Sequence, residues 1–477
     1  MGKVGDSLCK SENCIKTITD KKVSVCVADI KNLKEPVLVK GIPIFGNALS
    51  MRKDPAKFFY NCYREYGSVF RLRLMNKTCT VLAGVESANF MGTREGIDVL
   101  NSKKIWHGLE EEYGCEHFLL SQEGDTHQKL RAAMRHGHSK ESLEGRYDDL
   151  ILITHSMIAH NWPVGQLVPV VNNMERIIVE QIGLILMDKS PSEYIDNVRK
   201  MNLYVLNTLV RGIYPKFILK DPRYKRAKKK VFEFVQQMIV DYRSRKNIRG
   251  STHRNLMDDI METHARDPDL ITTKDFGIFL TGPFVAGLET MASTTASFIY
   301  EVLKHPEVHA LVCKEADALF AKSAICEKDL LNLPTINGAL METMRMHPVA
   351  SALPRIATRD FAFHGYRIPA GERLYMATTV PHFMEEYYLN PEIFDINRYT
   401  RPRNEHLKPG VYSPFGRGPH ICLGQSVAKV QMLLTVARLF YDLELELESP
   451  DYQLKAQTLP LPRSNLGFKV RVKNRRH

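Results

Sequence analysis

Long apolar runs are missing from this 477-residue sequence, and so is the apolar segment that opens a secreted chain. No run approaches the roughly 18 apolar residues that a membrane-spanning helix needs. We therefore expect a cytoplasmic or otherwise intracellular protein that is soluble or attached only peripherally to a membrane. The hydrophobic share of 44% and the charged share of 25% are those of an ordinary globular protein.

Closely spaced cysteine pairs are also missing. Nine cysteines are scattered along the chain and none forms a Cys-x-x-Cys pair, which excludes a zinc ribbon and a thioredoxin-type site. Their odd number and wide scatter indicate free thiols in a reducing compartment.

A repeat of fixed period and a long linker are equally missing. Length alone, at roughly 150 residues per domain, would suggest three domains. Because no linker divides the chain, we expect residues 36–477 to form a single domain. The polar residues 1–35, of mixed charge, are typical of an N-terminal extension, which we expect to be mobile or loosely attached.

Acidic residues are too few to balance the basic ones, so the net charge is +12 and the pI about 9.1. Residues 211–230 contain nine Lys or Arg and one Asp, interleaved with apolar side chains. A solvated charged loop, a contact with a membrane surface and a contact with nucleic acid all fit this stretch. The solvated loop is the most ordinary reading, and a nucleic-acid partner is not expected.

Cap and turn signals divide the rest of the chain into mostly helical segments. Asp54-Pro55 is typical of a helix start, Gly67 of its end, and the alternation over 69–82 predicts a hairpin. The apolar spacing between 86 and about 350 is mainly helical, and short strands are expected towards the C-terminus. The predicted fold class is mainly α with small β-sheets (α+β). The long helices are expected at 148–160, 174–187, 193–212, 226–245, 273–305 and 306–321, and the later strands near 361–368, 372–377, 443–448 and 467–473.

The first candidate site is the glycine-rich loop Phe415–Gly424, which precedes an apolar-periodic helix running to about Phe440. A helix N-terminus lowers the pKa of a nearby thiol and favours the thiolate, so Cys422 is a candidate ligand for iron. A buried structural cysteine in a tight turn is the alternative. A dinucleotide-binding loop fails, because Ile421 stands where the third glycine is needed.

Two further stretches carry charges in apolar surroundings. Glu342 and Arg345 are three apart and share one face of the predicted helix 335–346, although an ordinary surface ion pair has the same spacing. Glu289 and Thr290 place a carboxylate and a hydroxyl midway along the apolar helix 276–303, after small residues that would let a flat ligand approach. The alternative is a local kink in which the threonine hydroxyl bonds back to a carbonyl.

Basic side chains gather on the predicted helix 125–138. His127 and Arg131 are four apart and project from the same side, where they can bind carboxylates on a flat cofactor. A solvated helix face is the alternative. The full set is His127, Lys129, Arg131, Arg135 and His136.

Together and in this order, the four stretches resemble the cytochrome P-450 (haem-thiolate monooxygenase) family from about residue 36 onwards. The cysteine loop matches the specific signature F-G-x-G-x-[RH]-x-C-x-G at every constrained position. Residues 286–290 match [AG]-G-x-[DE]-T, and 127–131 occupy the place of W-x-x-x-R. The members of the family's structural triad are matched by Glu342, Arg345 and Arg398. The resemblance implies the family's fold, with haem between a long central helix and the cysteine loop.

Positions that depart from the family pattern indicate which branch of the family the chain resembles. His420 and His127 stand where membrane-bound members usually carry Arg and Trp, which is similar to soluble bacterial members. Met291 replaces the second hydroxyl residue that often follows the threonine. The sterol 14-demethylase branch usually has His where Glu289 stands, so the resemblance argues against that assignment.

The resemblance implies a role for each matched residue. Cys422 would be the axial ligand of haem b (iron protoporphyrin IX), and Glu289 and Thr290 would relay protons during oxygen activation. The triad would fix the loop that carries the cysteine. The implied cofactor-binding residues are His127, Arg131, Ala286, Gly287, Arg355, Phe415, Gly416, His420, Cys422 and Gly424, among which the two histidines and two arginines would hold the propionates. The implied substrate-pocket residues are Phe118, Phe284, Val285, Ala350, Leu353 and Leu459.

The implied reaction inserts one oxygen atom from O₂ into a small apolar substrate, of steroid, terpenoid or fatty acyl type. No flavin or iron–sulfur domain fits in the remaining residues, so NAD(P)H would act only indirectly, through a separate electron donor. That donor would be a ferredoxin or a flavoprotein reductase. Candidates for its docking face are Lys129, Arg135, Arg417 and Lys429.

Other functions of a haem-thiolate protein stay open beside this one. An isomerase or dehydratase that rearranges peroxides needs no external electrons, and neither does a peroxide-driven peroxygenase. A haem gas sensor, which is no enzyme, needs no proton relay. Isomerases of this kind often lose the acid–threonine pair, which this chain retains at Glu289 and Thr290.

Overall fold

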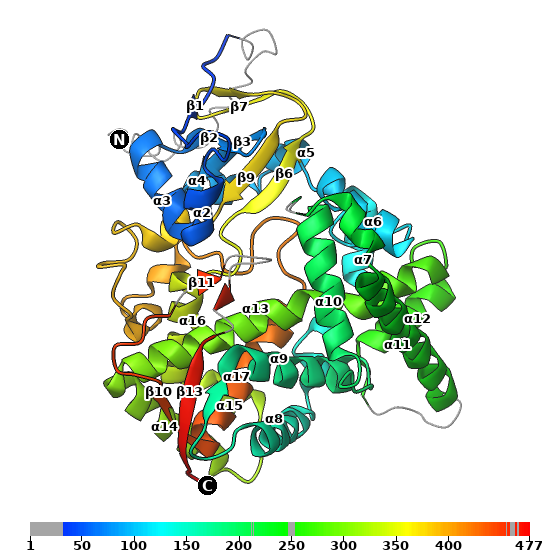
Figure 1. The fold of residues 1–477 in the computed structure, drawn as a ribbon, viewed down its shortest axis with the longest axis vertical. Helices are drawn as coiled ribbons and strands as arrows, with labels where there is room; N and C mark the ends of the chain where they lie inside the picture. The colour runs from blue at the N-terminus through cyan, green and yellow to red at the C-terminus, as the bar shows by residue number, and fades with distance from the viewer. Residues whose placement is uncertain are drawn as a thin grey trace, which may run out of the picture.

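The computed structural model describes residues 32–210, 212, 214–246, 253–454, 456–457, 463–464 and 467–477. Residues 1–31 of the expected N-terminal extension and the expected pocket residue Leu459 lie outside these ranges. Within them, a large helical part makes up most of the molecule, and a sheet with short helices lies above it in Figure 1.

Helices follow the apolar periodicity closely, so the expected fold class is confirmed. The segments expected at 174–187 and 193–212 are interrupted, because each ends in a π-type turn, Ile182–Leu186 and Leu206–Val210. The helices are α2 (Ala48–Lys53), α3 (Pro55–Tyr66), α4 (Val85–Phe90), α5 (Arg94–Val99), α6 (Lys103–Tyr113), α7 (Gly124–Ala133), α8 (Tyr147–Asn161), α9 (Val170–Gln181), α10 (Ile195–Val205), α11 (Pro222–Lys246), α12 (Leu256–Arg266), α13 (Phe276–Lys304), α14 (Pro306–Phe320), α15 (Glu327–Leu331), α16 (Pro334–Met346) and α17 (Gln425–Asp442).

Helix α3 shows how local signals set a boundary. The Asp54 carboxylate accepts a hydrogen bond from the backbone N–H of Lys57 at 3.0 Å, and Pro55 takes the first helical position, where no N–H is needed. Gly67 ends the helix with a φ of 84°, which a residue with a Cβ rarely adopts. The predicted start and end of this helix are both confirmed.

The largest sheet in the described ranges has the strand order β1-β2-β3-β9-β6-β4. The predicted hairpin is its β2–β3 pair, in register from Val69–Leu82 to Leu74–Lys77. Strand β9 then joins β3 in parallel, which brings the C-terminal half of the chain onto the N-terminal hairpin. The strands are β1 (Val37–Leu38), β2 (Val69–Leu74), β3 (Lys77–Ala83), β4 (Leu100–Asn101), β5 (Leu167–Pro169), β6 (Leu353–Ala357), β7 (Phe361–Phe363), β8 (Tyr366–Ile368), β9 (Arg373–Ala377), β10 (Leu443–Leu447), β11 (Ala456–Gln457), β12 (Arg463–Ser464) and β13 (Lys469–Arg475).

Helix α13 crosses the middle of the helical part and packs against α9, α16 and α17 (Figure 1). With the turn before it, over 273–304, it is by length and composition apolar enough to cross a membrane, although it contains no unbroken run of 18 apolar residues. Counting consecutive apolar residues missed it, because isolated polar residues interrupt the run. Since 67% of its most apolar window is buried inside the protein, it serves as a core helix in this fold.

Candidate functional site

The loop formed by residues 415–424 closes on itself ahead of α17. The backbone N–H of Cys422 donates to the carbonyl of Phe415 at 2.9 Å. Gly418 has a φ of 74°, and a Cβ there would lie 2.3 Å from the carbonyl oxygen of Met91. Glycine is therefore required at this position twice over, by the backbone conformation and by the close approach of a neighbouring chain segment.

Cys422 keeps accessible surface as a residue, although the surrounding protein desolvates its thiol. Burial raises the pKa of the thiol and outweighs the Gly424 N–H and the Arg131 charge, which both lower it. The expected pKa depression is thus wrong for the free thiol, because α17 begins only at Gln425 and desolvation is the larger effect. A coordinated metal cation nevertheless removes the proton of such a thiol outright.

Among the described residues, no other protein ligand set competes with Cys422 for a metal. In the part of the chain that the structure describes, no group of three or more His, Cys, Asp or Glu side chains could hold a metal ion. A metal bound by Cys422 would therefore take its remaining ligands from a non-protein group, as the iron of haem does. A structural zinc site, with its four protein ligands, does not fit.

Helix α7 brings two expected donors to the cysteine loop. Arg131 Nη1 donates to the carbonyl of Ile421 at 2.8 Å. The ring of His127 lies 4.2 Å from the ring of His420, tilted by 35°. His127 is buried, and its Nε2 has no hydrogen-bond partner among the described residues. Because such an atom costs stability, its presence indicates a ligand that completes the site.

The basic groups beside this loop are partly desolvated. Burial, followed by the charges of His420 and Arg131, lowers the pKa of His127 to about 4, so its ring is neutral at pH 7. Burial lowers the pKa of Arg355, on β6, to about 10, which leaves this guanidinium charged. Arg131 and Arg355 therefore supply the positive potential that an anionic ligand needs, and His127 supplies a neutral polar atom.

Glu123, just before α7, belongs to this group although the sequence reasoning missed it. One of its oxygens accepts from the backbone N–H and the hydroxyl of Ser102 at 2.7 and 2.9 Å, and the other lies 2.9 Å from Nε2 of His420. Burial raises the pKa of Glu123, but the hydrogen bond and charge of His420 and the Ser102 donors outweigh it, and the net effect lowers the pKa. No motif marks this residue, because its partners come from two distant segments.

A narrow stripe of α13 keeps accessible surface along an otherwise buried helix. Ala286 is exposed and Thr290, one turn later, is half-buried, whereas Glu289 is only 5% exposed. The Thr290 hydroxyl donates to the Ala286 carbonyl at 2.7 Å, the back-bonded arrangement that the sequence reasoning weighed as an alternative. The Thr290 oxygen can still accept a hydrogen bond from a group in front of the stripe.

Gly287 has a packing role that the sequence did not show. A Cβ at this position would lie 2.7 Å from Cδ1 of Ile182, in the π-type turn that follows α9. The glycine therefore permits close packing of α13 against that turn, and the approach of a flat ligand is not needed to explain it. Ala286, by contrast, is exposed on the stripe.

The residues of the expected triad form a buried ion-pair cluster, which excludes an ordinary surface pair. Arg345 donates to both carboxylate oxygens of Glu342 at 2.7 and 2.8 Å, and Arg398 Nε donates to Glu342 at 3.0 Å. The Tyr399 hydroxyl also donates to Glu342, at 2.7 Å. The three triad residues are at most 1% exposed. Further guanidinium N–H groups reach the backbone carbonyls of His382, Leu389, Asn390, Pro391 and Ile393.

The expected pocket residues do not share one environment. Phe284 is fully buried and packs edge-on against Phe234 of α11, with ring centroids 5.8 Å apart. Its side chain has no surface to offer a substrate, so its assignment to the pocket wall is corrected: the helical period turns it away from the exposed stripe. The others with described side chains keep accessible surface; they are Phe118, Val285, Ala350 and Leu353.

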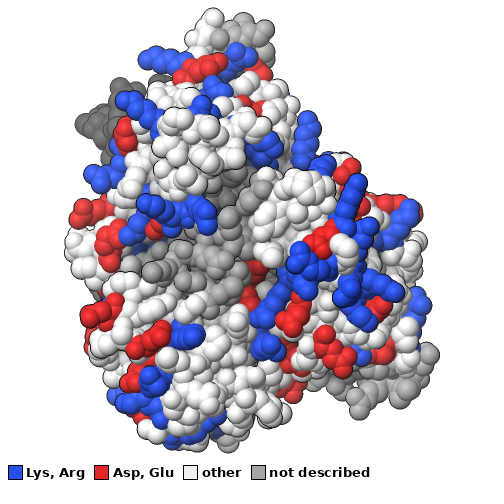
Figure 2. Space-filling view, in the orientation of Figure 1, with Lys and Arg blue, Asp and Glu red and all other residues white. Residues whose placement is uncertain are grey.

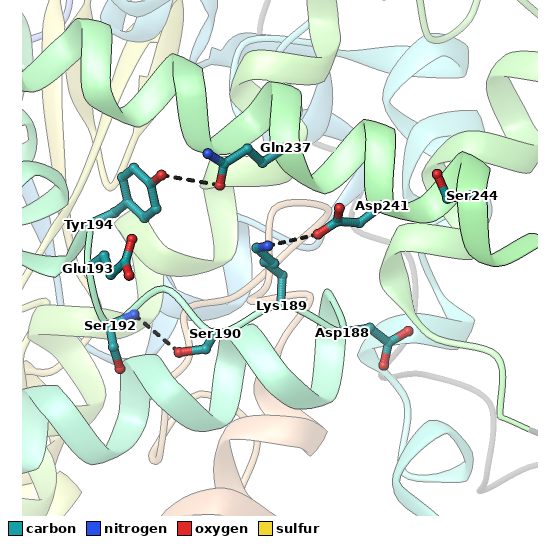
Figure 3. A pocket seen from close by; sticks show the side chains of 9 residues that line it. All are labelled: Asp188, Lys189, Ser190, Ser192, Glu193, Tyr194, Gln237, Asp241 and Ser244. Carbon is teal, nitrogen blue, oxygen red and sulfur yellow. Dashed lines mark hydrogen bonds and ion pairs between the residues drawn. The ribbon is translucent and has the colours of Figure 1, made fainter.

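A separate cavity of about 660 Å³ lies between α11 and the loop before α10 (Figure 3). Polar groups around it bond to one another: Lys189 with Asp241 at 2.8 Å, and the Tyr194 hydroxyl with Gln237 at 3.1 Å. None of the residues singled out from the sequence lines it. It is therefore not the site of the chemistry described above.

A mainly helical fold with the exposed Cys422 just ahead of the core helix α17 is the arrangement that the resemblance to haem-thiolate proteins implies. The model of the cytochrome P450 family matches residues 36–470, and the chain belongs to this family. It is 24% identical to cytochrome P450 3A7 of Homo sapiens, over 83% of this chain and 82% of that one. It is 26% identical to the sterol 14alpha-demethylase of Mycolicibacterium vanbaalenii, over 85% of this chain and 90% of that one.

Solved structures show the same fold at low sequence identity. The cytochrome P450DA heme domain superposes with a TM-score of 0.80 at 19% identity, over 93% of this chain and 98% of that one. A retinoic acid bound cyanobacterial CYP120A1 superposes with a TM-score of 0.78, also at 19% identity, over 93% of this chain and all of that one. The family and the fold that the sequence motifs predict are therefore confirmed.

The residues present fit the haem-thiolate cofactor that membership of this family implies. Cys422 is an exposed residue with a free thiol, and the described ranges contain no competing protein ligand set for a metal. The Nε2 atom of His127 is a buried polar atom that lacks a partner in the described structure. Arg131 and Arg355 provide charge for anionic groups at the edge of such a cofactor.

Proposed function

We propose that the chain is a haem-dependent monooxygenase that inserts one oxygen atom from O₂ into a small apolar substrate of steroid, terpenoid or fatty acyl type. The observation that carries the proposal is the accessible Cys422 thiol, on a loop whose backbone only glycine permits at Gly418. Haem bound through this sulfur would supply the activation of O₂. Residues 36–477 would act as one domain.

Different residues of the chain would bind the cofactor, relay protons and support the cysteine loop. Cys422 holds the iron, and Arg131, Arg355 and His127 bind the propionates by hydrogen bonds, of which those from the arginines are charge-assisted. Glu289 and Thr290 would relay protons: the protonated Glu289 carboxyl would give its proton to the Thr290 hydroxyl as that hydroxyl gives up its own towards the stripe, and a proton from solvent would then restore the carboxyl. The buried Glu342 cluster holds the backbone that leads to the cysteine loop.

A reduced-CO difference spectrum tests the cofactor assignment. The purified chain should show the red-shifted Soret band of thiolate-ligated haem, and Cys422→Ser should lose it. A band that Cys422→Ser leaves unchanged would overturn Cys422 as the ligand. Thr290→Ser is the matched control at the other end of the site, since it keeps the hydroxyl and should keep the band.

Turnover experiments separate the rival functions. Activity with O₂ and a surrogate reductase, but little with peroxide alone, supports the monooxygenase. Turnover with peroxide alone would indicate an isomerase or peroxygenase, and spectral gas binding without turnover of any substrate would indicate a sensor. A screen for substrate-induced spin-state change, over the three apolar classes named above, comes first because it needs no electron donor.

Electrons would come from a separate ferredoxin or flavoprotein reductase. Lys129, Arg135 and Lys429 are exposed, as a docking face for an acidic partner requires. Arg417 is half-buried and donates to Asn89 at 3.2 Å, so it is a poorer docking residue than the other three. We therefore confine the proposed docking face to Lys129, Arg135 and Lys429.

A peripheral contact with an anionic membrane is the second part of the proposal, and it would place the protein at an intracellular membrane surface. Figure 2 shows Lys and Arg gathered over the region of α10 and α11, with acidic residues among them. Phe217, within the basic stretch 211–230, is 67% exposed, and Ile44 is 77% exposed. Arg211 and Ile213 lie outside the described residues.

Flotation with liposomes tests this contact. Vesicles with a rising share of anionic lipid should carry more of the protein upwards at low salt, and Phe217→Ser should weaken this. No binding at low salt would remove the membrane contact and leave a solvated charged surface. Leu152→Ser, at a residue 66% exposed on α8, is a control of similar exposure outside the basic stretch.

A further inference from the structure

The sequence motif assigns His420 to a haem propionate, yet the structure engages its Nε2 atom elsewhere. That atom lies 2.9 Å from a carboxylate oxygen of Glu123, and the histidine side chain is only 7% exposed. A nitrogen that donates its single hydrogen to Glu123 is not free to donate it to the cofactor. The partner of the His420 Nε2 atom is thus another residue of this chain.

The Glu123 carboxylate is itself hydrogen-bonded by Ser102, on the oxygen that does not face His420. Ser102, which precedes α6, donates its backbone N–H to the second carboxylate oxygen at 2.7 Å, and its hydroxyl lies 2.9 Å from the same oxygen. The hydroxyl also lies 2.6 Å from the carbonyl of Leu120, so Ser102 contacts the end of the connection between α6 and α7 at two points. The Glu123 carboxylate is therefore held by the Ser102 backbone N–H on one oxygen and by His420 on the other, which fixes its orientation.

His420 in turn lies against His127. The two rings are 4.2 Å apart, and the buried Nε2 of His127 has no partner in the described part of the chain. His127 thus has a buried polar atom that a ligand can engage, and the ring of His420 packs against it. A residue that orients a binding histidine through its other contacts is a recurrent device at cofactor sites.

We propose that Glu123 is a positioning residue for the haem edge: it anchors His420 to the α6–α7 connection, and His420 then holds His127 towards a propionate. The inference rests on the haem binding proposed above. It differs from the role that the family resemblance gives His420, which is direct binding of the propionate. It also ties the cysteine loop to Ser102, which no sequence motif connects with it.

Transfer of haem from the purified holoprotein to excess apomyoglobin tests this inference. In Glu123→Ala the transfer rate should rise by about 10–100-fold, the usual effect of losing an outer partner of a cofactor site. Glu123→Gln should stay close to the wild-type rate, because its amide oxygen can still accept from His420. Glu116→Ala is the matched control, since Glu116 lies on the same connection but makes an exposed pair with Lys274.

The reduction potential of the haem separates positioning from simple structural support. Both Glu123→Ala and Glu123→Gln remove a negative charge near the cofactor, so both should raise the midpoint potential, whereas only Glu123→Ala should speed haem transfer. The double variant of Glu123→Ala with His420→Ala should lose haem no faster than the faster single variant. This non-additivity shows that the two residues act as one unit.

Two results would overturn the inference. One is a Glu123→Ala transfer rate within about two-fold of the Glu116→Ala control, against the larger change expected for an outer partner. The other is additive effects of Glu123→Ala and His420→Ala, which would return His420 to independent binding of the propionate. Failure of the proposed function would look different, because the wild-type chain would then bind no haem with a thiolate-type spectrum.

Discussion

Two of the buried groups of charged and polar side chains in the described part of the chain differ in how completely they are bonded. In the Glu342–Arg345–Arg398 cluster, salt bridges and backbone carbonyls satisfy the guanidinium groups, and exposure is 1% or less. Beside the cysteine loop, the buried Nε2 of His127 has no partner among the described residues. A fully bonded group supports the fold, whereas a buried group left incomplete indicates a place for a ligand.

The largest expected effect comes from breaking the complete cluster. Arg345→Met leaves the Glu342 carboxylate buried without its main partner, which should lower the free energy of unfolding by about 3–5 kcal/mol. Urea denaturation of the cofactor-free chain measures this. Lys57→Met is the control, because Lys57 makes an exposed pair with Glu392 and should cost at most about 1 kcal/mol. Equal losses in the two variants would contradict the comparison.

Substitution of His127, in the incompletely bonded group beside the cysteine loop, should weaken haem binding without lowering the stability of the cofactor-free chain. His127→Phe keeps a ring beside His420 but removes the buried polar atoms, so haem affinity should fall by about 10–100-fold. The cofactor-free chain should be as stable as the wild type or more so, because an unpaired polar atom is lost. Haem titration and urea denaturation measure the two effects. A large loss of stability without loss of haem affinity would make His127 a structural residue.

The complete cluster also predicts a pH dependence through His382. Its Nδ1 lies 3.2 Å from the Arg345 carbonyl, and its Nε2 accepts the backbone N–H of Ser413 at 3.0 Å. Burial, followed by the charge of Arg345, lowers the pKa of His382 to about 3, so the folded state excludes the proton that the unfolded state binds below about pH 6.5.

Stability from His382 is therefore complete above about pH 6.5 and is lost as the pH falls towards 3. By pH 5 this histidine alone should cost about 2 kcal/mol of the free energy of unfolding. His382→Gln should lack this part of the acid loss when urea denaturation is followed at pH 6.5 and pH 5. Parallel losses in wild type and variant would show that His382 does not carry the dependence.

The smallest expected effect is on the rate of reduction, and it comes from the proposed docking face for the electron donor. Reversing Lys129 and Lys429 to Glu should slow reduction by an acidic electron donor by about 10-fold at low salt, and less at high salt. The haem spectrum should not change, since both side chains are exposed. Stopped-flow reduction measures the rate, with Lys314→Glu on α14 as the control. Reduction as fast as in that control would remove this docking face.

Much of the incomplete group could be predicted from the sequence, because motif spacing places Cys422, His127 and Arg131. Glu123 could not be predicted, since its partners Ser102 and His420 come from segments that meet only after folding. The contact between His420 and Glu123 could not be predicted for the same reason. A motif states which residue types recur at a position, but the hydrogen-bond partner of a ring nitrogen depends on what packs beside it.

For the Glu342–Arg345–Arg398 cluster, the sequence predicted the members, and it predicted the pairing of Glu342 with Arg345 as well. Glu342 and Arg345 share a helix turn, so their pairing follows from helical geometry alone. Their burial does not, because three apart on a helix is also the spacing of a surface ion pair. The tertiary structure decided it by bringing Arg398 and Tyr399 onto Glu342.

The sequence by itself determined the fold class, the helix boundaries at caps such as Asp54, the family and the cysteine that marks the site. These depend on periodicity, capping and local motifs, which involve residues close to one another in the sequence. Only the tertiary structure decided that burial raises the pKa of the Cys422 thiol, that Gly287 serves packing against Ile182, and that Phe284 faces the core. Each of these is a balance of desolvation or close contact between distant segments, and such a balance exists only once those segments meet.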